Sequence, residues 1–329
     1  METIFLQNHE DRLNLDDGQL IQTRRQTVIG QYPIRAVDQI LVHGNPQITT
    51  QAIKECLKEG IRIDYFSIRG EFLGSLEPER PQNLSRRLAQ YRLYFAPPRR
   101  LNWAKALLQL KIQSEIVELR RLREQKVDLP LRAVRKELTA RLRQTADAAG
   151  LPELLGIEGC CARLYYQMFP YILPPSLPWN GRHSHPAADG INALLSLIYS
   201  VTAREIRAEL AKHGLDPHCG FLHEPGASGL TYDLLEPLRA VFCDHLALRI
   251  ARRDPEICLR ATPVSSGGVI LGRDGCDHVC RRVRSALDIR HARQQFTPRE
   301  QFRRLISATT DALDRDADTP DFHNICPER

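Results

Sequence analysis

Two glutamates and a histidine in this sequence could together hold a divalent cation. Glu158 stands in the apolar stretch Leu-Leu-Gly-Ile-Glu-Gly, where an isolated carboxylate needs a cation, a hydrogen-bond donor or a metal. His223 ends the apolar segment Gly-Phe-Leu-His, and Glu236 follows 13 residues later. A site of two carboxylates and one imidazole, without a thiolate, suits Mg²⁺ or Mn²⁺ better than structural zinc. Because so few protein ligands leave positions for phosphate oxygens, such a site could promote phosphodiester chemistry by activating water or a sugar hydroxyl.

Each of these residues, taken alone, also has a structural explanation. Glu158 could lie at a helix surface or pair with an arginine such as Arg163. A single histidine is more often a hydrogen-bonded structural residue than a metal ligand, so His223 is weak evidence by itself. The metal hypothesis therefore depends on all three residues meeting in the fold.

Asp233 and Glu236 are three residues apart, so on a helix both carboxylates face the same way. Asp233 could instead be the N-cap of a helix whose capping box is closed by Glu236, and Pro237 would then fall in the first turn. The local pattern favours the cap for Asp233 and leaves Glu236 free to face a cation. The two roles of Asp233 need not exclude each other.

A second candidate metal site is the segment Cys276-Asp-His-Val-Cys280, with Cys258 and His291 nearby in the sequence. Its spacing is irregular for a zinc module, and no second pair of cysteines follows. The spacing therefore does not favour zinc, and the sequence leaves open whether these thiols do anything beyond packing. The odd number of cysteines, nine, is typical of reduced thiols. The sequence also has no signal segment and no apolar run long enough for a membrane span, so we expect a cytoplasmic protein.

Positive charge is concentrated in one part of the chain. Residues 86–143 contain 16 Lys and Arg against 5 Asp and Glu, a local balance of +11, whereas the whole chain carries +6. A basic segment of this kind indicates a polyanionic partner, because each neutralised phosphate releases counterions. The alternative is a solvated helix face without a partner.

The elements that must position these side chains change in type along the chain. Residues 1 to about 80 predict strands, a hairpin turn at Asp16-Asp17-Gly18 and one helix, Ile48–Glu59, closed by Gly60. The predicted strands are Thr3–Leu6, Arg12–Leu15, Leu20–Thr23, Ile40–Val42 and Ile61–Phe66.

Later residues carry apolar side chains at helical spacing. The predicted helices are Leu84–Tyr94, Leu101–Arg123, Leu131–Ala149 and Ile191–Leu210, with interruptions at Pro97-Pro98 and Pro130, a stop at Gly214 and a loose tail over Asp311–Arg329. The fold class is α+β: a small β-rich N-terminal domain, residues 1–80, followed by a larger all-α domain, residues 81–329.

Five motifs in order resemble one family, the CRISPR-associated spacer integrases, that is, the first Cas protein, which is also described as a DNA endonuclease. The motifs are Leu155-Gly-Ile-Glu158-Gly with Tyr165-Tyr166, Arg182-His-Ser-His-Pro-Ala-Ala-Asp189-Gly-Ile-Asn192, Gly214-Leu-Asp-Pro, Gly220-Phe-Leu-His223, and Asp233-Leu-Leu-Glu236-Pro-Leu-Arg239. The resemblance covers most of the chain and is densest from about 155 to 245. Ser114-Glu115 and Ala187 depart from the family pattern.

The resemblance implies a β-rich domain that helps form a homodimer and an α-helical catalytic domain. Glu158, His223 and Glu236 match the family's metal ligands, while Asp233 and Asn192 match neighbouring polar positions. A second Cas protein would bridge two dimers, and the assembly would join the 3′ hydroxyls of a captured double-stranded DNA fragment to a CRISPR repeat. We expect phosphate contacts from a set of basic residues: Arg86, Arg87, Arg99, Arg100, Lys111 and Arg182. A catalytically silent DNA-binding scaffold and a hydrolase of small phosphoesters remain alternatives.

Overall fold

The computed structural model divides the chain into two units, Met1–Gln82 and Asn83–Arg329. It describes residues 2–67, 72–77, 83–124, 131–183, 186–224, 228–264, 267–290, 295–322 and 325. Pro130 and His291, which the sequence singled out, lie outside the described residues. No helix in the described ranges is both long and apolar enough to cross a membrane.

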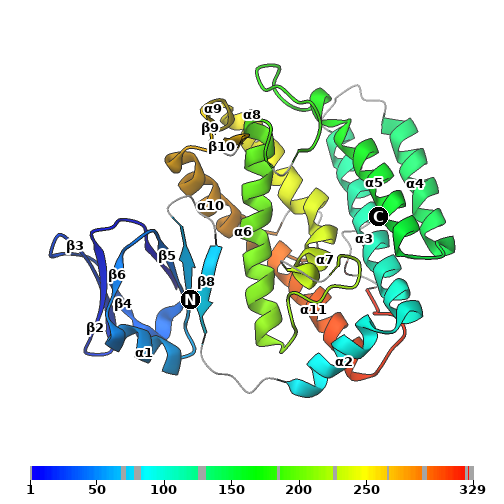
Figure 1. Ribbon diagram of the computed structural model, residues 1–329. Coiled ribbons are helices and arrows are strands. Elements are labelled where there is room, and N and C mark those ends of the chain that lie inside the picture. Colours follow the sequence, from blue (N-terminus) through cyan, green and yellow to red (C-terminus); the bar gives the residue numbers. More distant parts are fainter. Residues whose placement is uncertain are drawn as a thin grey trace. The chain divides into compact units, whose positions relative to one another are not determined.

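The first unit contains two four-stranded sheets and the helix α1 (Figure 1). One sheet has the order β1-β5-β7-β8 and consists of Glu2–Leu6, Val37–His43, Arg62–Phe66 and Phe72–Leu76. The other has the order β4-β3-β2-β6 and consists of Thr27–Pro33, Gln19–Arg24, Asp11–Asp16 and Gln47–Ile48. The β2–β3 turn uses Gly18 at φ +71°, and α1 (Thr50–Lys58) is capped by the Thr49 side chain and followed by Gly60 at φ +79°.

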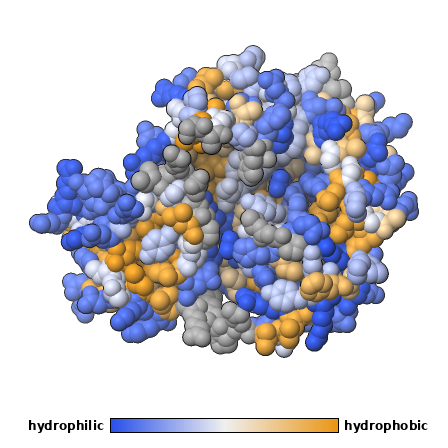
Figure 2. Space-filling model, in the orientation of Figure 1, coloured by the Kyte–Doolittle hydropathy of each residue, from blue (hydrophilic) through white to orange (hydrophobic). Residues whose placement is uncertain are grey.

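The five predicted strands and the predicted helix are all present in this unit, which confirms its β-rich class. The strand β4 was not predicted, because none of its residues is buried and its sequence therefore lacks an apolar alternation. The unit also exposes large apolar side chains, visible as orange surface in Figure 2. The described members of this set are Val28, Ile29, Leu73 and Leu76.

The second unit is mainly helical. Its helices are α2 (Leu84–Tyr94), α3 (Pro97–Glu124), α4 (Leu131–Asp147), α5 (Leu151–Tyr166), α6 (Gly190–Lys212), α7 (Gly229–Leu238), α8 (His245–Arg253), α9 (Glu256–Leu259), α10 (Arg273–Leu287) and α11 (Pro298–Asp314). A π-helical segment, Arg239–Asp244, joins α7 to α8, and β9 (Thr262–Pro263) pairs with β10 (Val269–Ile270). Helices α3, α4 and α5 pack together, and α7 packs against both α3 and α6 (Figure 1).

Three predictions for this unit were wrong in detail. The helical pattern breaks before Pro97-Pro98, as predicted, but α3 begins at Pro97 and not at Leu101, because first-turn residues need no backbone N–H donor. Helix α7 begins at Gly229, so Pro237 lies near its end and Asp233 in its interior. Helix α11 continues to Asp314, so the first part of the predicted loose tail is helical.

Arg86 ties α2 to two distant segments. Its Nη2 and Nε lie 2.5 and 3.0 Å from Asp314 Oδ2 and Oδ1 at the end of α11, and its Nη1 donates to His213 O at 2.7 Å. The hydrogen bond from Arg86 lowers the pKa of Asp314, although partial burial opposes this shift. Helix packing here therefore depends on an ionised Asp314.

We expect Asp314→Asn to destabilise the protein at neutral pH but not in acid. The pKa of Asp314 is lower in the folded protein than in the unfolded chain, where it is about 3.9. The ion pair therefore stabilises the folded protein at pH values above about 3.9, and this stabilisation is lost as the pH falls through the folded-state pKa. The half-exposed pair supports a loss of about 0.5–1 kcal/mol in the free energy of unfolding at pH 7. Urea unfolding against pH measures this. Asp147→Asn, at the exposed end of α4, is the matched control, and an equal effect of both variants would contradict the assignment.

Candidate metal centre

Glu158, His223 and Glu236 meet in the second unit. Glu158 comes from α5, Glu236 from α7, and His223 from the loop that precedes α7. One candidate ligand atom from each lies within 4.8 Å of the other two. Glu236 is buried, whereas the side chain of His223 is 34% exposed, so the group is reachable from one side. Among the described residues, no other such group of His, Cys, Asp and Glu is found.

Asp233 holds the loop that carries His223. Its buried carboxylate accepts the backbone N–H groups of Phe221 at 2.5 Å, of Leu222 at 3.0 Å and of His223 at 3.0 Å. It also lies 2.7 Å from His223 Nδ1, so Nε2 is the ring nitrogen left for a cation. Burial would lower the pKa of His223, but the hydrogen bond and charge of Asp233 outweigh it and raise the pKa. Asp233 is thus a positioning residue and not the predicted N-cap, a place taken by Ser228.

Two glycines allow this close approach of loop and helix. A Cβ atom on Gly220 would lie 2.7 Å from the backbone of Gly229 and 2.9 Å from Asp233 Oδ2. A Cβ atom on Gly229 would lie 2.8 Å from His218 O. All three distances are shorter than real Cβ contacts, so any larger residue would push the loop away from the carboxylate that anchors it.

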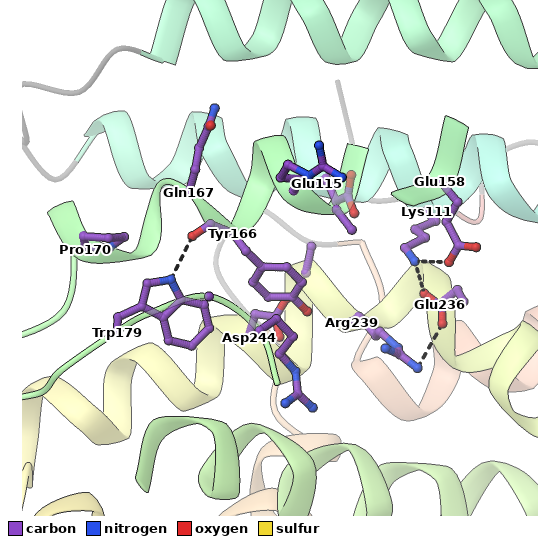
Figure 3. Close-up of a pocket in the computed structure, with 15 residues that line it drawn as sticks. Lys111, Glu115, Glu158, Tyr166, Gln167, Pro170, Trp179, Glu236, Arg239 and Asp244 are labelled. Atoms are coloured by element: carbon purple, nitrogen blue, oxygen red, sulfur yellow. Dashed lines mark hydrogen bonds and ion pairs between the residues drawn. The ribbon is translucent and has the colours of Figure 1, made fainter. Parts of the chain in front are cut away.

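Lys111 of α3 lies between the two glutamates, and Figure 3 shows all three side chains pointing toward one another. Its Nζ is 2.5 Å from Glu158 Oε1 and 2.7 Å from Glu236 Oε2. Arg239 Nη2 lies 2.9 Å from the other oxygen of Glu236. Burial would raise the pKa of Glu236, but Arg239, Lys111 and His223 together lower it to about 2. Glu158 therefore pairs with Lys111 and not with Arg163, and Glu236 is ionised.

These residues fit a divalent cation. The donor set is two carboxylates and one imidazole nitrogen, which is the chemistry of an oxygen-rich site. Glu236 Oε2 is buried and meets no hydrogen-bond criterion with the described residues, and the Lys111 ammonium lies 2.7 Å from it as an ion pair. An ammonium held by two carboxylates marks a position that already stabilises positive charge.

A cavity of about 710 Å³ opens beside Lys111, Glu158 and Glu236 (Figure 3). Its other lining groups include three cations, two carboxyls and two aromatic rings: Arg163, Arg182, Arg239, Glu115, Asp244, Tyr166 and Trp179. Burial is the first cause that raises the pKa of Glu115 to about 8 and of Asp244 to about 7. Among these lining groups only Arg182 was predicted to have a functional role, because the others come from separate segments whose contacts no local spacing predicts.

Asn192 is buried but belongs to a different cluster from the three candidate ligands. Its Oδ1 accepts from Arg182 Nη1 at 3.0 Å and from His183 N at 2.9 Å, and its Nδ2 donates to Gly181 O at 3.0 Å and to Asp189 Oδ2 at 2.9 Å. It thereby fixes the loop that brings Arg182 to the cavity. The catalytic role of Asn192 stays a prediction. In this structure Asn192 would act through Arg182, whose loop it holds.

Most of the predicted DNA-contact residues are engaged within the protein. Besides Arg86, Arg99 lies 2.8 Å from Asp316 Oδ1. Arg100 donates to Phe221 O at 2.9 Å and pairs with Glu224 at 3.1 Å, which supports the His223 loop from α3. Arg87 is likewise engaged. The DNA contacts of these arginines stay predictions. In this structure Arg86, Arg99 and Arg100 connect helices α2 and α3 to other segments of the second unit.

The thiols of the second candidate site are packed in the protein. Gly190 lies against Cys258, since a Cβ atom there would be 2.0 Å from Cys258 O. Cys276 Sγ donates to Leu271 O at 3.5 Å, and burial raises the pKa of Cys276 to about 11. Cys280 is also a free, partly buried thiol. These contacts agree with a packing role.

Comparisons with known proteins identify relatives of this chain. The family model described as CRISPR associated protein Cas1 matches residues 4–283. A CRISPR-associated endonuclease Cas1 of Thermus thermophilus is 33% identical over 251 residues, covering 75% of this chain and 73% of that protein. A Cas4 exonuclease and Cas1 endonuclease fusion of Leptospira interrogans is 32% identical over 254 residues, covering 74% of this chain but 47% of that protein.

Solved structures share the fold at lower identity. A casposase bound to an integration product matches with a TM-score of 0.80 and 20% identity, covering 98% of this chain and 94% of that chain. A chain of a Cas6-RT-Cas1–Cas2 complex matches with a TM-score of 0.80 and 18% identity, covering all of this chain and 36% of that one. These matches support the β-rich and helical arrangement described above.

We expect Asp233→Ser to destabilise the second unit strongly. Serine is a good N-cap and would be tolerated if Asp233 capped a helix. Asp233, however, accepts three backbone N–H groups. Its replacement leaves these buried donors unsatisfied and should lower the free energy of unfolding by about 2–4 kcal/mol. Urea unfolding measures the loss. A change below about 0.5 kcal/mol would favour the cap.

Proposed function

The chain belongs to the Cas1 family of CRISPR-associated proteins, and we propose on this basis that it is a metal-dependent DNA endonuclease and integrase. In this proposal it inserts captured DNA fragments as spacers into a CRISPR array. The observation that carries the proposal is the convergence of Glu158, His223 and Glu236 from three separate segments to within 4.8 Å. The casposase match, a structure bound to an integration product, supports the same reaction class.

The proposed reaction exchanges one phosphodiester for another. A 3′-hydroxyl oxygen forms a bond to phosphorus and loses its proton, while the bond to the leaving 3′ oxygen breaks and that oxygen takes up a proton. One phosphodiester replaces another, so no ATP is required. Mg²⁺ or Mn²⁺ would polarise the phosphate and stabilise charge on the attacking and leaving oxygens. Glu158, Glu236 and Nε2 of His223 would hold the cation, and Asp233 would keep His223 in the required tautomer. Arg163 and Arg182, which line the cavity, are placed to bind phosphate oxygens.

Double-stranded DNA, a second Cas protein and a second copy of this chain are the proposed partners. The exposed apolar side chains of the first unit, Val28, Ile29, Leu73 and Leu76, suit a homodimer contact. The match to a chain of a complex that contains Cas2 supports the second Cas protein as a partner. A catalytically silent scaffold remains the second candidate, and metal-dependent nicking of branched DNA by the purified protein separates the two.

The cations best placed to contact DNA phosphates lie on α4. Arg132, Lys136 and Arg143 are exposed and share one helical face, since 4 and 11 residues are close to whole turns. Within the described ranges their side chains make no ion pair or hydrogen bond. They therefore keep their charge for a partner, unlike the arginines of α2 and α3 that pair internally.

Glu158→Gln and His223→Ala should each abolish strand joining while folding and DNA binding remain, because each removes one of the three groups that would hold the cation. The assay is integration of a short duplex into a repeat-bearing target with the second Cas protein and Mn²⁺, with EDTA expected to act like the substitutions. Glu153→Gln, on the same helix as Glu158, is the matched control. Full strand joining by either variant would refute the site.

Replacing Arg132, Lys136 and Arg143 together with Gln should weaken DNA binding uniformly across sequences. If all three contact phosphates, the slope of log K against log salt should fall by about 2–3. Fluorescence anisotropy at several salt concentrations measures this. A triple Gln variant of Arg273, Arg281 and Arg282 on α10 removes the same charge elsewhere. An equal loss in that control would show that only net charge matters.

A further inference from the structure

Lys111 occupies the position that a bound cation would need. Its side chain is 9% exposed, and its ammonium lies 2.5 Å from Glu158 Oε1 and 2.7 Å from Glu236 Oε2. Both carboxylates are candidate metal ligands. An ammonium at these distances takes up lone pairs that a metal would use, because metal and ammonium both seek the same oxygen atoms.

The two cations cannot share the site without a large electrostatic cost. A divalent ion bound about 2.1 Å from these oxygens would lie only a few ångströms from the ammonium. The site is buried, so water screens this repulsion poorly. Lys111 also lines the cavity beside the glutamates, and its four-carbon side chain gives the ammonium room to move there.

Arg239 does not compete in the same way. Its Nη2 bonds to Oε1 of Glu236, whereas Lys111 faces Oε2. Glu236 would therefore keep its orientation if the ammonium left. The two cations therefore differ in the metal-free centre. Arg239 holds Glu236 in its orientation, whereas Lys111 lies where the metal would bind.

We propose that Lys111 is a built-in counter-ion that competes with the divalent cation for Glu158 and Glu236, so that metal binding requires the ammonium to swing into the cavity. The inference rests on the proposed metal site. It makes Lys111 a residue that sets metal affinity and neutralises the metal-free centre, and the displaced ammonium then faces the cavity in which phosphate would bind.

Titration of the full-length protein with Mn²⁺ alone, followed by the EPR signal of free Mn²⁺, tests the proposal. Lys111→Met should bind Mn²⁺ about tenfold more tightly than the unaltered protein, because one competing positive charge is gone. Lys111→Arg, which keeps the charge, should not gain affinity. Lys105→Met is the matched control on α3, since the Lys105 ammonium donates to Ala146 O and, in the part of the chain that the structure describes, pairs with no carboxylate. Unchanged or weaker Mn²⁺ binding by Lys111→Met would overturn the proposal.

A companion measurement separates this proposal from the metal site itself. If His223→Ala abolishes Mn²⁺ binding but Lys111→Met leaves it unchanged, the site stands and the competition fails. If neither the unaltered protein nor Lys111→Met binds Mn²⁺, the proposed metal site and the proposed competition both fail. Without Mn²⁺, Lys111→Met should also melt at a lower temperature, and Mn²⁺ should raise its melting temperature more than that of the unaltered protein.

The unaltered protein offers a readout that does not depend on the stability of the methionine variant. In protein labelled with ¹³C at lysine Cε, the Lys111 signal is assigned by its absence in Lys111→Arg. Adding diamagnetic Mg²⁺ should shift that signal as the ammonium leaves the glutamates, while the Lys105 signal stays in place. A Lys111 signal that does not move at saturating Mg²⁺ would refute the displacement.

Discussion

The carboxylate of Asp233 is the contact on which the metal centre depends. It gathers three consecutive backbone N–H groups and the His223 ring, and so fixes a loop that has no regular structure of its own. The loop can reach this carboxylate only because Gly220 and Gly229 face each other without side chains. Arg100 holds the same loop from α3 through Phe221 O. His223 is therefore positioned by α7 and α3 together, although neither helix carries it.

Charge compensation explains much of the basic excess in the sequence. Lys111 and Arg239 neutralise Glu158 and Glu236 inside the protein, and Arg86 and Arg99 pair with carboxylates of α11 and of the residues that follow it. The segment that suggested a polyanionic partner thus divides its cations between two tasks. Arg86, Arg99 and Lys111 stabilise the helical unit, whereas Arg132, Lys136 and Arg143 on the exposed face of α4 remain unpaired within the described residues.

Periodicity predicted the elements well and the site poorly, for physical reasons. Helices such as α4 and α6, and strands such as β2 and β3, each have a buried face, so apolar residues recur along the sequence at the spacing of that face. The three candidate ligands are 65 and 13 residues apart, so no local rule links them, and only the ordered family motifs grouped them. Asp233 was misread as a cap because proline, usually a first-turn residue, here lies near the end of α7. Lys111 and Glu115 reach the site from a different helix, which local patterns cannot reveal.

The π-helical segment Arg239–Asp244 begins directly after α7, two residues beyond Pro237. A π-turn accommodates one more residue per turn than an α-turn, so it changes the direction in which later side chains point. Asp244 faces the cavity and accepts a hydrogen bond from Tyr199, while Glu236 and Arg239 reach the same cavity from the preceding turn. The length of this segment therefore determines the rotation of α8 relative to α7. A chain shortened by one residue here would rotate α8 by about 100° relative to α7 and carry Asp244 away from the cavity wall while leaving every ligand residue in the sequence.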